Sequence, residues 1–155
     1  MLRALAVFIG AVVLIVAAGV SGALFWVWPT FFPDAQIKCT SVEIAHLKEL
    51  QAERKFVEDR RRFYFGASSE ETRAAAQASV DRVIEQLLRD LPSNPKRSVV
   101  LGIFKQSLSN LGTSESEERD EYLHYLERIM DILGVQSSGQ LLTVWRYGFP
   151  YGWLV

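Results

Sequence analysis

The stretch from Ala4 to Trp28 reads ALAVFIGAVVLIVAAGVSGALFWVW and contains no ionisable side chain. At a rise of 1.5 Å per residue, about 20 apolar residues in a helix cross the roughly 30 Å hydrocarbon core of a bilayer. The sequence therefore predicts a transmembrane anchor within residues 1–33, which contacts the lipid bilayer through residues 4–28.

The distal end of this stretch fits the same interpretation. Trp26 and Trp28 are typical of the aromatic belt at a membrane interface. Pro29 and Pro33 are expected to end the helix where the chain enters water, because proline cannot continue a helical hydrogen-bond ladder. We therefore predict that Trp26 and Trp28 lie at the membrane interface.

A cleaved signal peptide is the alternative interpretation of this segment. Arg3 would be its short basic region, and Ser21-Gly22-Ala23 would be its small-residue cleavage site. The apolar core of a signal peptide is usually only about 7–15 residues long, whereas apolar residues resume here after Ala23. The length favours the anchor, and both interpretations export the segment that follows.

Few charges set the orientation of the predicted anchor. The amino terminus and Arg3 lie on one side, and Lys38 lies among Asp34 and Glu43 on the other. The positive-inside bias places the N-terminus in the cytoplasm. We therefore expect a single-pass protein of the bacterial inner membrane, with a helical domain at residues 34–155 in the periplasm.

The composition excludes some function classes. The 155 residues have a formal net charge of −1, whereas nucleic-acid binding calls for a strongly basic domain or stripe, so we predict no nucleic-acid partner. Cys39 is the single cysteine, which excludes an intrachain disulfide and a cysteine zinc site.

Apolar residues in the exported part recur at intervals of three and four, which is typical of amphipathic helices. Thr40-Ser-Val-Glu43 has capping-box spacing and predicts a first helix that runs to about Tyr64. Its apolar face is predicted to contain Leu47, Leu50 and Val57. Ser68-Ser-Glu-Glu71 predicts the start of a second helix, which Pro92 and Pro95 end.

Three more helices are predicted by the same signals. The third covers about residues 95–111, and the fourth begins at Ser114-Glu-Ser-Glu117 and ends near Leu133. A short fifth helix begins at Ser137 or Ser138. Short connections between amphipathic helices favour antiparallel packing, so we predict an all-α fold with a compact bundle of four to five helices.

Two Glu-x-x-His pairs, Glu43–His46 and Glu121–His124, match part of the ligand set of a di-iron centre in a helix bundle. The predicted third helix supplies no acid for the rest of the set. His124 also falls nearly opposite the apolar face of its helix, so we expect it to point into water. His46 is expected to be an edge residue near the apolar face. We predict no metal and no cofactor.

The C-terminal segment WRYGFPYGWLV has an aromatic residue at every odd position from 145 to 153. These residues are Trp145, Tyr147, Phe149, Tyr151 and Trp153. One interpretation is that the segment folds back and completes the core of the bundle. The other is that it binds a protein partner, because large aromatic side chains commonly anchor protein interfaces.

The run Met130–Leu142, MDILGVQSSGQLL, with Trp145 and Tyr147-Gly148-Phe149 after it, resembles the closing signature of a small uncharacterised family of bacterial helical domains. The resemblance covers about the last thirty residues. The family pattern has an acid before the glycine, where this chain has Ser138. The resemblance implies a helical fold and supplies no activity.

No catalytic residue can be assigned. The serines lack a Gly-x-Ser-x-Gly elbow, and the chain has no glycine-rich phosphate loop. The expected function is therefore a membrane-tethered, non-catalytic periplasmic domain that binds a protein partner. Two alternatives stay open: an enzyme with scattered active-site residues, and a structural subunit of a membrane complex.

Overall fold

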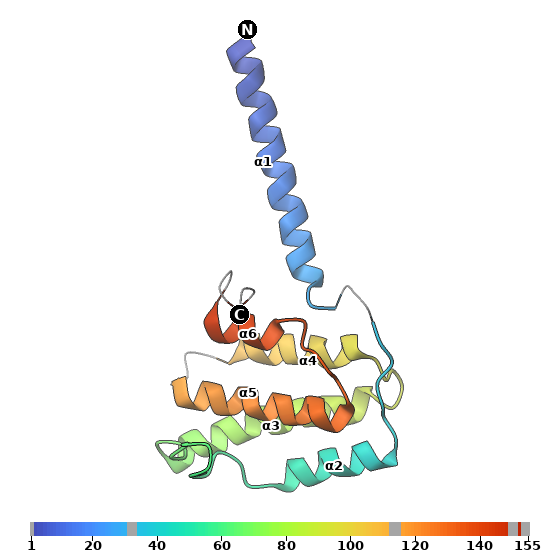
Figure 1. The fold of residues 1–155 in the computed structure, drawn as a ribbon, viewed down its shortest axis with the longest axis vertical. Helices are drawn as coiled ribbons and strands as arrows, with labels where there is room; N and C mark the ends of the chain where they lie inside the picture. Colours follow the sequence, from blue (N-terminus) through green and yellow to red (C-terminus); the bar gives the residue numbers. More distant parts are fainter. Residues whose placement is uncertain (1, 31–33, 112–115, 149–151, 153–155) are drawn as a thin grey trace.

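The computed structural model describes residues 2–30, 34–111, 116–148 and 152, and these residues contain six helices. The helices are α1 (Leu2–Val27), α2 (Ser41–Ala52), α3 (Glu70–Asp90), α4 (Arg97–Asn110), α5 (Ser116–Leu133) and α6 (Leu141–Tyr147). Figure 1 shows α2 to α6 packed together, while α1 projects away from them. The predicted all-α bundle is confirmed.

Helix α3 is central to the bundle because it packs against α2, α4 and α5. Helix α6 packs against α4 and α5 at the end of the domain from which α1 projects (Figure 1). The five helices enclose one apolar core that includes Leu47, Ile84, Phe104 and Leu126. Helix α2 lies at the opposite end, farthest from α1.

Side-chain caps define where several helices begin. The Thr40 hydroxyl accepts from the amide of Val42, and the Glu43 carboxylate accepts from the amide of Thr40, so the predicted capping box is present. Ser69 caps α3. The carboxylate of Asp34 accepts from both the amide and the hydroxyl of Ser98, which supplies a negative charge at the start of α4.

The prediction that the first helix runs to about Tyr64 is wrong. Helix α2 ends at Ala52, and the chain then turns so that Phe56, at φ 57°, enters the core. The Phe56 ring lies 5.1 Å from the ring of Tyr125, and its amide donates to the Tyr125 hydroxyl. Val57, predicted to be on the apolar face, is instead 43 % exposed. Core contacts that are distant in sequence therefore override the helical pattern.

The buried ammonium of Lys55 holds this turn in place. Its side chain is fully buried, and Nζ donates to the carbonyls of Gln51 and Glu53 and to the carboxylate of Asp81 at 2.7 Å. The two carbonyls belong to the end of α2, which otherwise lacks partners for its last acceptors. Lys55 therefore ends α2 and ties it to α3.

Two other boundaries differ from the predictions or lie beyond the described residues. Helix α6 begins at Leu141 instead of Ser137 or Ser138, because Gln140 adopts a left-handed conformation directly before it. Ser114, the predicted start of the fourth helix, lies outside the described residues. The predicted starts of the second and third helices agree with the structure within two residues.

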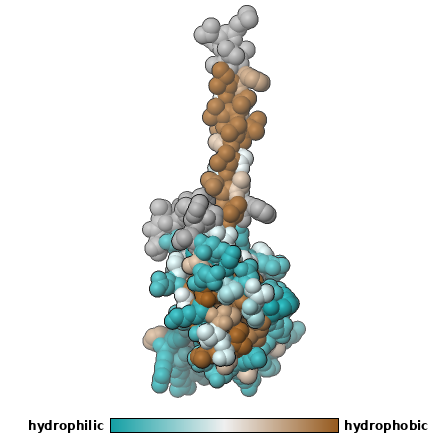
Figure 2. Space-filling model, turned by 90° about the vertical axis from the view of Figure 1, so that its right-hand side faces the viewer, coloured by the Kyte–Doolittle hydropathy of each residue, from teal (hydrophilic) through white to brown (hydrophobic). Residues whose placement is uncertain are grey.

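Helix α1 carries large apolar side chains that are exposed along its described length, among them Phe8, Leu14 and Ile15. Figure 2 shows them as an apolar column above a largely hydrophilic domain surface. Within the part of the chain that the structure describes, no helix has the length and hydropathy needed to cross a membrane. The anchor over residues 4–28 stays a prediction.

Replacing Asp81 with asparagine is expected to destabilise the domain by about 3 kcal/mol, because the buried ammonium of Lys55 then lacks a charged partner. Chemical denaturation of the full chain in detergent, followed by tryptophan fluorescence, measures this change. Glu85→Gln, which removes the same charge one turn further along α3 at an exposed site, is the control and should cost under about 1 kcal/mol. Equal effects of the two variants would contradict the role given to Lys55.

Candidate functional site

The junction between α1 and the bundle is built around Trp28. Its side chain is only 7 % exposed, and its indole nitrogen donates to the carbonyl of Gly139 at 2.9 Å. The Lys105 ammonium donates to the carbonyl of Trp28 and lies 5.8 Å from the centre of its ring. Trp28 is therefore packed against the domain. The predicted place of Trp28 and Trp26 at a membrane interface stays a prediction, and the Trp26 side chain is not among those that the structure describes.

Gly139 is needed for this junction. Its φ of 60° lies in the left-handed region, and a Cβ there would approach Arg97 Nη2 to 2.9 Å and Pro29 Cβ to 3.1 Å. The Arg97 guanidinium also donates to the carbonyl of Ser137, so the α5–α6 connection and the start of α4 meet at this point. The end of α1 is thus fixed to the domain.

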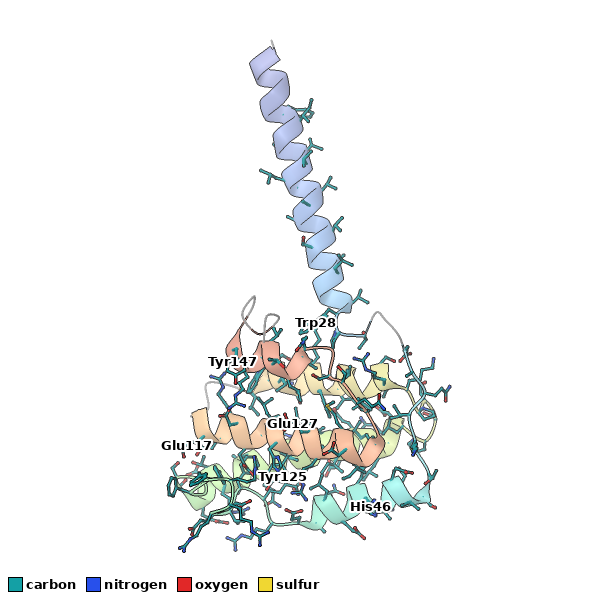
Figure 3. The ribbon with its side chains drawn as sticks, in the orientation of Figure 1. Trp28, His46, Glu117, Tyr125, Glu127 and Tyr147 are labelled. Atoms are coloured by element: carbon teal, nitrogen blue, oxygen red, sulfur yellow. The ribbon has the colours of Figure 1, made fainter. Side chains whose placement is uncertain are left out.

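Helix α6 carries one exposed and one partly buried aromatic residue. Trp145 is partly buried, donates to the carbonyl of Leu108 and has the Arg119 guanidinium 5.0 Å above its ring. Tyr147 is 51 % exposed and has the Arg146 guanidinium 5.3 Å from its ring. Figure 3 places Tyr147 at the same end of the domain as Trp28.

The C-terminal segment beyond α6 is described only at Gly148 and Gly152. Phe149, Tyr151 and Trp153 lie outside the described residues. Gly152 is described and buried, and its amide donates to the carbonyl of Gly148. Within the described part, then, Trp145 fits the interpretation of the segment as core and Tyr147 fits its interpretation as a binding surface.

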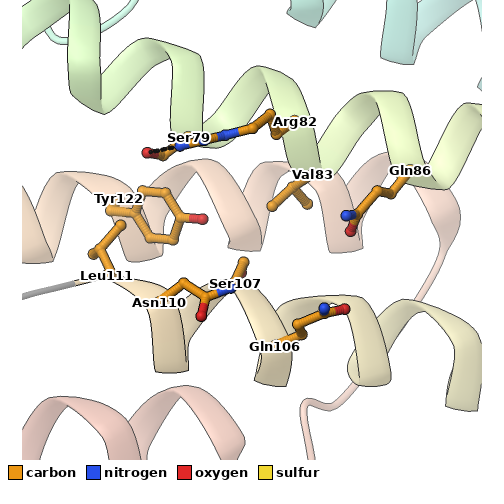
Figure 4. Close-up of a pocket in the computed structure, with 9 residues that line it drawn as sticks. All are labelled: Ser79, Arg82, Val83, Gln86, Gln106, Ser107, Asn110, Leu111 and Tyr122. Carbon is orange, nitrogen blue, oxygen red and sulfur yellow. Dashed lines mark hydrogen bonds between the residues drawn. The ribbon is translucent and has the colours of Figure 1, made fainter.

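A polar cavity of about 300 Å³ lies between α3 and α4 (Figure 4). Helix α3 lines it with Ser79, Arg82 and Gln86, and α4 lines it with Gln106, Ser107 and Asn110. Sequence reasoning missed this cavity, because isolated amides and hydroxyls on amphipathic helices look like ordinary solvent-facing residues. No motif could have identified it.

Tyr122 of α5 reaches the same cavity. Its side chain is 1 % exposed, yet its hydroxyl makes no hydrogen bond with any described residue, and Figure 4 shows the hydroxyl directed between α3 and α4. Burial raises the pKa of Tyr122, and the nearby Ser107 hydroxyl and the Arg82 charge oppose that rise only in part. The phenol is therefore a neutral donor at neutral pH. Nothing in the sequence indicated that this hydroxyl would be buried without a partner.

A second polar group is buried where α5 meets residues 53–69. The Arg62 guanidinium lies 2.7 Å from the carboxylate of Glu121, and burial raises the pKa of Glu121 despite that charge. Burial, with the charges of Glu118 and Glu121, raises the pKa of Tyr64. The Tyr64 hydroxyl and Glu118 Oε2 are buried and have no hydrogen-bond partner in the part of the chain that the structure describes.

The two predicted Glu-x-x-His pairs lie in different settings. His124 is partly buried rather than fully in water, and burial together with the charges of Arg62 and Arg128 lowers its pKa. His46 is exposed on α2, the helix that buries Leu47 and Leu50 (Figure 3). Among the described residues, no three His, Cys, Asp or Glu side chains gather into a group that could hold a metal ion.

A family model described as Domain of unknown function (DUF4844) matches residues 38–150. The chain belongs to this family. The resemblance predicted for about the last thirty residues therefore extends through nearly the whole bundle, so its predicted extent was too short. The DUF4844 domain begins after the junction at Trp28 and includes the cavity and α6.

Among solved structures, the DUF4844 domain is similar to the crystal structure of a DUF3571 family protein from Acinetobacter baumannii. The TM-score is 0.64 at 22 % sequence identity, and the alignment covers 74 % of this chain and 95 % of that chain. At this identity the similarity shows the fold alone. The chain matches no curated protein.

The Gly139→Ala substitution is expected to destabilise the DUF4844 domain by about 2 kcal/mol and to expose Trp28, because it adds strain and a contact at the junction. Denaturation and quenching of tryptophan fluorescence measure the two effects. Gly134→Ala is the matched control: Gly134 also has positive φ, 67°, but its Cβ would meet open space. Equal loss of stability in the two variants would show that the contact contributes nothing.

Proposed function

We propose that the chain is a membrane-tethered, non-catalytic domain of the bacterial periplasm that binds a protein partner through α6. The observation that carries this proposal is the position of exposed Tyr147. It lies with Arg146 at the end of the domain from which α1 projects (Figure 3). A partner in or near the same membrane would meet this end first.

The tether is supported by the sequence and by the surface of α1. Residues 4–28 contain no ionisable side chain. The described side chains from residue 8 to residue 24 are all exposed, so the bundle does not bury them. A contiguous apolar surface of this kind marks an interaction with a membrane or with another protein. The uninterrupted apolar length of residues 4–28 favours the membrane.

The surface on α6 has the chemistry of a protein interface. Tyrosine and arginine are enriched among residues that contribute most to binding. Tyr147 stacks with Arg146, whose guanidinium is also held by the Asp120 carboxylate at 2.7 Å, so both side chains are positioned before binding. Arg119, which lies over the Trp145 ring, donates to the carbonyl of Arg146. Preorganised side chains lose less conformational entropy when a partner binds.

The periplasmic location rests on the charges that flank residues 4–28. Arg3 and the amino terminus lie before them, and the positive-inside bias keeps that side in the cytoplasm. Protease treatment of spheroplasts distinguishes the two orientations. A domain that resists the protease until the membrane is broken would contradict the periplasmic location.

Placing lysine at both Val13 and Val16 is expected to release the full chain from membranes, because two charges in the middle of a span cost about 5–7 kcal/mol. Both side chains are exposed, so the bundle loses no contact. The measurement is the fraction of protein that stays in the membrane pellet after alkaline carbonate extraction. Leucine at both positions is the control and should stay in the pellet.

Two results of this experiment would reject the tether. In one, the unmodified chain is itself released by carbonate. In the other, mass spectrometry finds a mature N-terminus near Ala23, which would establish the signal-peptide alternative.

A photoreactive phenylalanine at position 147 is expected to give a discrete crosslinked protein in intact cells. The same residue at position 63 should not, although Phe63 is 86 % exposed. Phe63 is the matched control because it lies in the 53–69 segment, at the other end of the domain from α1 (Figure 1). Immunoblotting of the irradiated cells measures the adduct. Equal labelling from both positions would remove α6 as the specific binding surface.

A further inference from the structure

We propose that the cavity between α3 and α4 binds a small hydroxycarboxylate, a ligand class that neither the fold nor the family assigns. None of the described residues that line the cavity belongs to α1 or α6, so this proposal is independent of the membrane tether and of the partner surface. It begins with the Tyr122 hydroxyl, which is buried, unpaired and directed into the cavity (Figure 4).

The unpaired hydroxyl indicates a missing acceptor. A buried polar group without a hydrogen bond destabilises the fold, and native proteins retain few of them. Ser107 lies close enough to influence the pKa of Tyr122, but its hydroxyl donates to the carbonyl of Phe104, and the Tyr122 hydroxyl makes no hydrogen bond with it. An oxygen of a ligand in the cavity would accept from the phenol.

The charge of the lining favours an anion. Arg82 is the single charged side chain among the described lining residues, and its guanidinium donates to the Ser79 hydroxyl at 3.0 Å. No carboxylate within the described chain forms an ion pair with Arg82. A guanidinium binds a carboxylate through paired hydrogen bonds.

The remaining lining residues define the rest of the ligand. The side-chain amides of Gln86, Gln106 and Asn110 both donate and accept, which suits a hydroxyl group. Val83 and Leu111 offer apolar contact for a short carbon chain. The volume of about 300 Å³ is at the lower end of the range for ligand sites, so it selects a small molecule over a peptide or a nucleotide.

The test uses the full chain in detergent and follows thermal unfolding by tryptophan fluorescence. The probe is L-malate at about 10 mM, with sodium chloride at matched ionic strength as the reference. A ligand that binds only the folded state raises the unfolding midpoint, and we expect a rise of several degrees. Inorganic phosphate and glycerol test the anion without a carbon chain and the hydroxyl groups without a charge.

Two variants connect any shift to the cavity. Arg82→Gln is expected to weaken L-malate binding at least tenfold. Arg89→Gln should leave it unchanged, because Arg89 is exposed on the same helix but is not among the described residues that line the cavity. Tyr122→Phe should also weaken binding about tenfold. Without ligand, its unfolding midpoint should equal or exceed that of the unmodified chain, because the variant loses an unpaired hydroxyl.

Each other outcome overturns the proposal. Absence of a shift with L-malate rejects the site. An equal shift with phosphate rejects the organic ligand, and a larger shift with glycerol rejects the anion. An undiminished shift in Arg82→Gln places the binding elsewhere. A lowered midpoint for ligand-free Tyr122→Phe would show that the hydroxyl has a partner in the folded protein.

Discussion

The burial of the Trp28 indole fixes how the apolar helix α1 and the bundle are joined. Its hydrogen bond to the carbonyl of Gly139 links residues 111 positions apart in sequence, and Lys105 holds the carbonyl of Trp28. Asp34 then caps α4 a few residues later. Trp28 and Asp34 lie near the two ends of the connection between α1 and α2, and both are bound to the bundle. The end of α1 is therefore attached to the bundle by more than the connecting chain. The end of the domain that carries α6 consequently has a set direction relative to α1.

The sequence predicts the helices well where local signals and burial agree. The Thr40–Glu43 capping box, the Ser69 cap and the prolines after α3 each restrict the backbone over a few residues, independent of the rest of the fold. The apolar stripe of α3 is buried as its period of 3.6 requires. Such signals are enough to predict the bundle, because short connections leave few ways to pack amphipathic helices.

The failures arise where distant contacts decide. The pattern after Ala52 continues to favour a helix, but Lys55 finds Asp81 and Phe56 finds Tyr125, and both partners lie on other helices. The partial burial of His124 has the same origin, because the 53–69 segment folds over that side of α5 through Arg62 and Glu121. Helical periodicity places a side chain on a face of its own helix, and it cannot show which segment will cover that face.

The candidate sites differ in how visible they are in the sequence, and the reason is chemical. Tyr147 belongs to a run with an aromatic residue at every odd position from 145 to 153, and such a run is unusual enough to be noticed in the sequence. A binding cavity built from amides and hydroxyls is not, because each of its residues is common on a helix surface. What distinguishes the cavity is the Tyr122 hydroxyl. Its lack of a hydrogen-bond partner costs about 1–3 kcal/mol, and phenylalanine at this position would remove that cost.

The surroundings of the unpaired atoms distinguish the cavity from the buried polar group at Arg62 and Glu121. The Tyr64 hydroxyl and Glu118 Oε2 also lack hydrogen-bond partners among the described residues. They lie beside the Arg62–Glu121 ion pair, however, within a cluster of charged side chains. Tyr122 has no carboxylate among the influences on its pKa, and its hydroxyl faces a space large enough for a small molecule. An unpaired donor next to a polar cavity therefore carries an argument for a ligand that an unpaired donor inside a charged cluster does not.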